Sequence, residues 1–283
     1  MNYSSVAIHP ASCQCARCQK IERQLSLVEY VRFDINPKSH GCTCGHSFCP
    51  RKVQAASGFV LGFFLIVHLG LLLFGLRPDS FKTLIRWLHS SEPILAWFEM
   101  TTLFLPLVIH TGMGLYLLSQ AGLKMNTGNE NHGSNIRFFW QRITALYLFV
   151  FLIFHIGTFH RWGFHLIHEM TDWSALDRYT QGGLFNLSAP FTSIVNGVRY
   201  FWNAQLHAAP GNFIVVVLYG LAVVAAVYHM ANGVLTGTRV LNILPQATIQ
   251  NRFWKFCLLL GIILLIIGFL DLYAYTVVPG FKH

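Results

Sequence analysis

The chain has 283 residues, of which 54% are hydrophobic and only 11% are charged, and its formal net charge is +9. A mean hydropathy of +0.48 is too high for an ordinary soluble domain and indicates a membrane protein. The first 50 residues contain no apolar run of the kind found in a cleavable signal peptide. The positive charges flank the apolar segments, so they require no nucleic-acid partner and we expect none.

Five apolar segments are long enough to cross a membrane as helices: 53–76, 94–120, 137–165, 212–237 and 253–277. Each holds a run of at least about 17 residues almost free of charge, and about 20 helical residues cover the hydrocarbon core. Proline and glycine separate the segments. The sequence therefore predicts an all-α, polytopic membrane bundle of five transmembrane helices over 53–278. The aromatic-rich stretch 166–210 is predicted to lie along the outer interface.

The Lys and Arg residues set the predicted orientation. Most of them lie at the segment ends that share a side with the N-terminus. Because basic residues are retained on the cytoplasmic side, this bias predicts a cytoplasmic N-terminus and an outer C-terminus.

Four of the five segments carry a histidine near their middle, namely His68, His110, His155 and His229. An imidazole is costly inside a membrane, which makes each histidine a candidate functional residue. Any one of them could be a buried histidine bonded to a neighbouring hydroxyl. Neutral imidazole is also a good ligand for haem iron, and one haem can take two.

The depths of the four histidines fall into two pairs. Counted from the cytoplasmic ends, His68 and His155 lie about 22 and 27 Å up, and His110 and His229 lie about 15 and 13 Å up. We therefore predict an outer haem between His68 and His155 and an inner haem between His110 and His229. A glycine follows each histidine within four residues, and we expect these glycines to let a flat macrocycle approach the helices.

The haems are predicted to be b-type. Covalent attachment requires Cys-x-x-Cys-His, and the Cys-x-x-Cys motif at Cys15 and Cys18 is followed by Gln19.

Three stretches, 105–118, 140–162 and 228–237, resemble the five-helix, two-haem cytochrome b subunit of succinate:quinone oxidoreductases. This is the b558-type membrane anchor of succinate dehydrogenase and fumarate reductase. The resemblance implies a flavoprotein subunit and an iron–sulfur subunit docked on the cytoplasmic face of a bacterial or archaeal cytoplasmic membrane. It also implies electron transfer between the iron–sulfur subunit, the two haems and a quinone, usually menaquinone. Succinate chemistry would reside in the flavoprotein.

Residues near the cytoplasmic edge are candidates to bind the propionates of the inner haem: Gln54, Ser57, Trp140 and Arg239. Similar proteins have comparable residues at the matching helix ends. The alternative is that the tryptophan and the arginine merely anchor the helices at the headgroups.

A quinone site is expected beside the outer haem, with an acid that exchanges protons with the quinol. Glu99 precedes His110 by 11 residues, which at about 100° per residue returns to nearly the same helix face about 16 Å further out. Glu92 lies on that face at the helix mouth, where it could instead be an ordinary carboxylate of the first helical turn. Asp271 and His160 are further candidates. Some relatives carry a proton-conducting acid two residues before the fourth ligand, and Val227 occupies that position here.

Residues 1–52 are predicted to form a separate cytoplasmic extension with a metal site. Two cysteine clusters mark it: Cys13, Cys15 and Cys18, and Cys42, Cys44 and Cys49. A reducing cytoplasm favours metal over disulfides, and thiolates suit zinc or an iron–sulfur cluster. Free thiols on a flexible arm are the alternative.

Two other functions stay open from the sequence. One is a haem b subunit of another membrane oxidoreductase, such as a hydrogenase or formate dehydrogenase. The other is a membrane protein without haem that uses its histidines for proton or metal transport.

Overall fold

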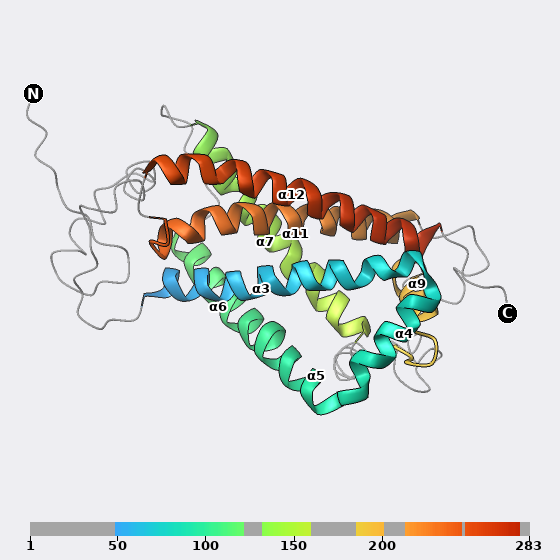
Figure 1. Ribbon diagram of the computed structural model, residues 1–283. Helices are drawn as coiled ribbons and strands as arrows, with labels where there is room; N and C mark the ends of the chain where they lie inside the picture. Colours follow the sequence, from blue (N-terminus) through green and yellow to red (C-terminus); the bar gives the residue numbers. More distant parts are fainter. Residues whose placement is uncertain (1–48, 122–131, 160–184, 201–212, 245–246, 278–283) are drawn as a thin grey trace, which may run out of the picture.

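The computed structural model describes residues 49–121, 132–159, 185–200, 213–244 and 247–277. Within these ranges every regular element is helical, which confirms the predicted all-α class (Figure 1). The elements are α3 (Pro50–Leu72), η1 (Leu73–Leu76), α4 (Pro78–Leu88), η2 (His89–Ser91), α5 (Glu92–Glu99), the π-helical η3 (Met100–Phe104), α6 (Leu105–Ala121), α7 (His132–Phe159), α9 (Pro190–Tyr200), α11 (Phe213–Val240) and α12 (Ala247–Thr276).

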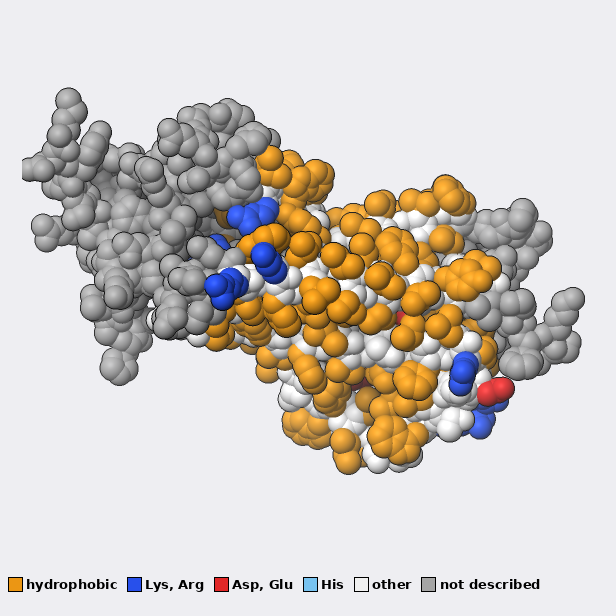
Figure 2. Space-filling model, turned by 45° about the horizontal axis from the view of Figure 1, so that its top comes forward, with side chains coloured by type: hydrophobic (Ala, Val, Ile, Leu, Met, Phe, Trp, Pro, Cys, Tyr) orange, Lys and Arg blue, Asp and Glu red, His pale blue; other side chains and the backbone are white. Residues whose placement is uncertain are grey.

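Within the part of the chain that the structure describes, five helical stretches are long and apolar enough to cross a membrane: Pro50–Leu76, Pro78–Gln120, Ile136–Gly157, Phe213–Val240 and Arg252–Thr276. They correspond to the five predicted segments, and the chain is a multi-pass membrane protein. Figure 2 shows hydrophobic side chains over the middle of the visible face and Lys and Arg toward its ends. A lipid environment explains why so many large apolar side chains face outward.

The second span begins earlier than predicted because residues 78–88 form a helix of their own, α4. Proline at its first position suits a helix start, since the ring fixes φ and the missing N–H has no helical partner there. Phe81, Ile85 and His89 follow one another at intervals of four residues and face the bundle interior. Phe81 is only 1% exposed and packs on Tyr275 of α12.

The helices pack as a chain of neighbours rather than as a closed ring. Helix α3 packs on α6 and on α11, and α11 packs on α7 and α12. Among the described helices, α3 scarcely touches α7, and α6 scarcely touches α11. Helices α6 and α7 therefore flank the core formed by α3 and α11. All four helices line a cavity.

We call the end of the bundle where α3 begins the Pro50 end, and the opposite end the α9 end (Figure 1). At the α9 end, α9 packs on α4, α11 and α12. A buried cluster holds them together, consisting of Phe81, Phe191, Ile194, Val198, Ala274 and Tyr275. Helix α9 belongs to the predicted interfacial stretch 166–210, of which 166–184 and 201–210 lie outside the described residues.

Candidate functional site

A single cavity of about 1400 Å³ extends along the bundle and is lined by α3, α6, α7 and α11, with α4, α5 and α12 contributing. Pockets that hold one small ligand usually measure about 300–1,000 Å³. This cavity therefore has room for more than one such ligand. All four predicted histidines line it.

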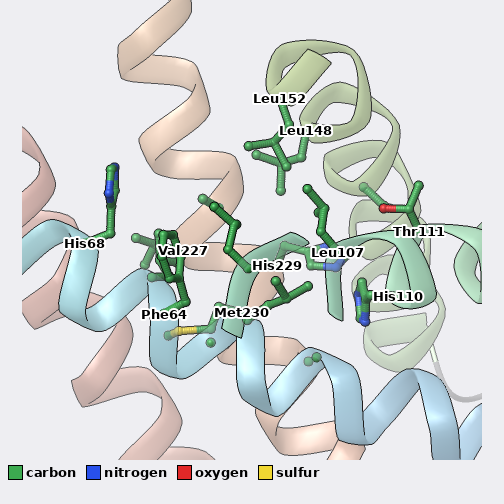
Figure 3. A pocket seen from close by; sticks show the side chains of 18 of the residues that line it. Phe64, His68, Leu107, His110, Thr111, Leu148, Leu152, Val227, His229 and Met230 are labelled. Atoms are coloured by element: carbon green, nitrogen blue, oxygen red, sulfur yellow. The ribbon is translucent and has the colours of Figure 1, made fainter. Parts of the chain in front are cut away.

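The structure places the four histidines in two pairs. The ring centres of His68 and His155 are 6.2 Å apart and the ring planes are 86° apart, and His110 and His229 have values of 6.1 Å and 85°. These are the pairs that the depth estimate predicts. Figure 3 shows His110 of α6 near His229 of α11, with His68 further along α3 beyond Phe64 and Val227.

The spacing within each pair fits one metal ion between two imidazoles. An imidazole nitrogen binds a metal at about 2 Å and lies about 1 Å from its ring centre, so two axial ligands have ring centres about 6 Å apart. Within the described residues there is no group of three or more His, Cys, Asp or Glu side chains able to hold a metal ion. Two imidazoles are nonetheless sufficient for haem, because the macrocycle supplies the other ligands of the iron.

The hydrogen bonds of the Pro50-side pair, His110 and His229, fix which ring nitrogen is free. The Nδ1 atom of His110 lies 3.0 Å from the carbonyl oxygen of Gln54, and Nδ1 of His229 lies 3.1 Å from that of Gln141. A carbonyl only accepts, so each Nδ1 carries the proton and donates it. Nε2 then keeps its lone pair for a metal, the usual arrangement of a metal-binding histidine.

A repeated short pattern builds both of these contacts. Gln54 and Ser57 on α3, and Gln141 and Thr144 on α7, are each spaced by three residues. The hydroxyl of Ser57 lies 3.3 Å from Nδ1 of His110, and that of Thr144 lies 3.4 Å from Nδ1 of His229. Ser57 thus lies on the Nδ1 side of the His110 imidazole and does not line the cavity. This position does not fit the role in propionate binding that was predicted for it. Thr144 and Gln141 were missed, although this repeat is a signal that points to them.

Gln141 also joins α7 to α11 through its side chain. Its Nε2 donates to the carbonyl oxygen of His229 at 3.1 Å, and its Oε1 accepts from Nδ2 of Asn232 at 2.8 Å. Both polar atoms of the Gln141 amide therefore hold α11, the helix that carries His229.

Aromatic rings support the α9-side pair, His68 and His155. Phe64 stacks on His68 at 5.7 Å and Phe151 stacks on His155 at 5.5 Å, each from one turn earlier on the same helix. The Tyr219 hydroxyl lies 3.3 Å from Nδ1 of His155. These contacts limit the rotation of both rings.

Basic side chains gather where the cavity reaches the Pro50 end. Of the predicted propionate residues, Gln54 and Arg239 line the cavity, whereas Trp140 is 50% exposed and does not. The interfacial alternative therefore describes Trp140 better. Three further arginines, which were not predicted to bind propionates, line the cavity beside Arg239, namely Arg51, Arg137 and Arg142. Guanidinium groups match carboxylates such as propionates in charge and geometry.

Acidic side chains lie toward the α9 end. Glu99 and Glu92 line the cavity from α5, where Glu99 is half-buried and Glu92 is exposed. Asp271 lines it from α12 and is 4% exposed. His160 lies outside the described residues. So do five of the six cysteines of the predicted metal site, and the sixth, Cys49, is a half-buried free thiol.

The expectation about glycines was wrong at Gly70, Gly112 and Gly157, which do not line the cavity. Two residues after a histidine lie about 200° around the helix, on the opposite face. Gly114 and Gly233 do line it, because residues four apart share a face.

Gly58 is the glycine on which the position of His110 depends most directly. A Cβ atom added at residue 58 would lie 2.9 Å from Cε1 of His110. We expect Gly58→Ala to displace this ring and to weaken cofactor binding by the Pro50-side pair by roughly tenfold or more, as the loss of a supporting contact does. Cofactor content per chain, measured by absorption, checks this. Gly70→Ala is the matched control, since no atom of the described residues lies within 4 Å of its added methyl group; equal losses in both variants would contradict the prediction.

No family model matches the chain, and no solved structure matches it significantly. The chain is similar to the succinate dehydrogenase cytochrome b558 subunit of Bacillus subtilis (strain 168), with 30% identity over 108 residues. The aligned region covers 38% of this chain and 52% of that protein, so the chain spans about half the length of the curated relative. Together with the five apolar helices, this similarity fits a membrane anchor of the cytochrome b type.

Proposed function

We propose that the chain is the membrane anchor and electron-transfer subunit of a succinate:quinone oxidoreductase. In this proposal it carries electrons between an iron–sulfur subunit and a quinone through two b-type haems. The observation that carries the proposal is the geometry of the two histidine pairs, 6.1 and 6.2 Å apart in one cavity. The partial relative, named a succinate dehydrogenase subunit, supports the choice of complex.

The chain's own residues would hold and tune these groups. His68 and His155 would bind one haem and His110 and His229 the other, and each haem when bound supplies one-electron redox chemistry. The Nδ1 donors of the Pro50-side pair keep their rings oriented and make Nε2 more basic. Leucine side chains along the walls, including Leu107, Leu148 and Leu152 (Figure 3), keep water away.

The Pro50 end would face the cytoplasm and the partner subunits. The four arginines that line the cavity at this end would bind haem propionates. A flavoprotein subunit and an iron–sulfur subunit would dock here, and the cysteine-rich N-terminal extension would hold zinc or an iron–sulfur cluster against them.

The quinone, which we propose to be menaquinone, would bind at the α9 end. The walls of the cavity there are aromatic and the polar groups are acidic, with Glu99 inside and Glu92 at the rim. These carboxylates would exchange protons with the quinone oxygens, because quinol oxidation releases protons together with electrons.

Purification of the chain with its native partners tests the proposal. We expect two b-type haems per chain in a reduced-minus-oxidised spectrum, a covalent-flavin subunit and an iron–sulfur subunit alongside, and zinc or iron beyond that of the haems and the partner. A nickel or molybdenum partner would instead identify another oxidoreductase. A complex without any b-type haem spectrum would favour the alternative in which the histidines serve proton or metal transport.

A further inference from the structure

Asp271 on α12 is the buried acid that the proposed haem sites do not use. It is 4% exposed, and neither of its carboxylate oxygens has a hydrogen-bond partner among the described residues. Buried polar atoms almost always have a partner, so an exception requires an explanation. Asp271 also lines the cavity. A partner that enters through the cavity during function would supply the missing hydrogen bond.

Asp271 lies at about the same level along the bundle as His68 and His155. A Cβ atom added at Gly220 of α11 would lie 3.7 Å from Leu272, so this part of α12 lies beside residue 220. The hydroxyl of the preceding residue, Tyr219, lies 3.3 Å from Nδ1 of His155. Asp271 is thus near the histidine pair that faces the α9 end.

The side chains around Asp271 indicate which kind of ligand this part of the cavity would bind. Phe81, Phe159, Phe185, Tyr219 and Tyr275 line it. Aromatic walls suit a flat aromatic ring, and one carboxylate among them suits a hydroxyl on that ring. The Tyr275 hydroxyl donates to the carbonyl oxygen of Leu72 at 3.0 Å, so its proton is not directed at Asp271.

We propose that Asp271 accepts one of the two protons released when a quinol is oxidised in this part of the cavity. The quinol gives up two electrons and two protons and becomes the quinone. The two electrons would go one at a time to the haem that His68 and His155 would hold, which supplies the one-electron chemistry. One O–H bond breaks as its proton moves to an Asp271 oxygen, and Glu99 on α5 takes the other proton. In quinone reduction the two acids return these protons.

This proposal rests on the proposed function and extends it, because Glu92 is exposed at the rim of the cavity and Glu99 inside it accounts for only one of the two protons. Figure 1 shows α5 and α12 on opposite sides of α3 at this end of the bundle. Glu99 on α5 and Asp271 on α12 line the same cavity, so each would serve one of the two oxygens of a quinone ring bound there.

The test uses the purified complex with succinate and dimethylnaphthoquinone, and with fumarate and the corresponding quinol. We expect Asp271→Asn to lower kcat at least about 100-fold, the usual contribution of a general base, with KM little changed. Asp271→Glu should restore much of the activity, and both variants should keep the full haem spectrum. Asp79→Asn is the control, since Asp79 is exposed on α4 and does not line the cavity.

A second measurement does not depend on turnover. A redox-induced infrared difference spectrum should contain a carboxyl C=O band that is absent in Asp271→Asn and shifted in Asp271→Glu. Normal turnover in Asp271→Asn, or an unchanged infrared band, would overturn the assignment while leaving the proposed function intact. Loss of haem from both variants would make Asp271 structural and would also overturn it. A wild-type complex without haem or quinone turnover would refute the proposed function, and the role of Asp271 with it.

Discussion

Replacement of His229 by alanine is expected to remove one of two b-type haem signals, and His110→Ala should remove the same one. The ring centres are 6.1 Å apart and each Nδ1 is hydrogen-bonded to a backbone carbonyl, so each ring would offer Nε2 to one shared iron. His68→Ala and His155→Ala should both remove the other signal. Electron transfer to quinone should fall to background in all four variants. Redox titration of the b-type absorption, with haem content per chain, provides the measurement.

His89→Ala is the matched control for these variants. His89 lines the same cavity, but it stacks on Phe185 and its Nδ1 donates to the carbonyl oxygen of Ile85 at 2.9 Å. Among the described residues it faces no second imidazole, and both haem signals should survive its removal. If His68→Ala and His110→Ala deplete the same signal, the pairing by depth is wrong.

Glu99→Gln is expected to lower quinone-linked electron transfer at least about 100-fold, because glutamine keeps the size of the side chain but cannot accept the proton. Glu99 is half-buried, lines the cavity and lies directly before the π-helical turn Met100–Phe104. Such turns often accompany functional sites. Both haem signals should remain, and the partner subunits should still oxidise succinate with an artificial acceptor. Parallel assays with quinone and with the artificial acceptor separate these effects.

Glu92→Gln provides the comparison within the same helix. Glu92 is exposed at the rim of the cavity, where water can replace it, so its loss should have a much smaller effect. Normal quinone turnover in Glu99→Gln combined with a large loss in Glu92→Gln would reverse the two roles. Loss of haem in Glu99→Gln would show that this glutamate holds the fold instead.

The spans could be predicted from the sequence because a membrane imposes one strong condition, about 20 consecutive apolar residues. The depths of His68 and His229 follow from the constant rise of a helix, so their assignment to different pairs needed no structure. Local features were harder to predict. Helix α4 has no long apolar run, and the π-helical turn η3 leaves no compositional mark.

The contacts behind the histidine rings could not be predicted in the same way. Whether Ser57 faces the cavity or the back of His110 depends on how α3 and α6 are rotated against each other, and composition does not fix that rotation. The prediction that Trp140 faces the cavity failed for the same reason. Its neighbour Gln141 faces inward and contacts His229, whereas Trp140 is on the exposed side of the helix. Only the repeated spacing of Gln54–Ser57 and Gln141–Thr144 connects these contacts to the sequence.

The histidine pairs join helices that scarcely pack on one another. His110 and His229 belong to α6 and α11, and His68 and His155 belong to α3 and α7, the two combinations with little direct contact. An iron in each pair would act as a cross-brace between the two flanking helices and the core. Biogenesis of the subunit would then depend on haem supply, because until both braces form each flanking helix packs on one core helix only among those described, α6 on α3 and α7 on α11.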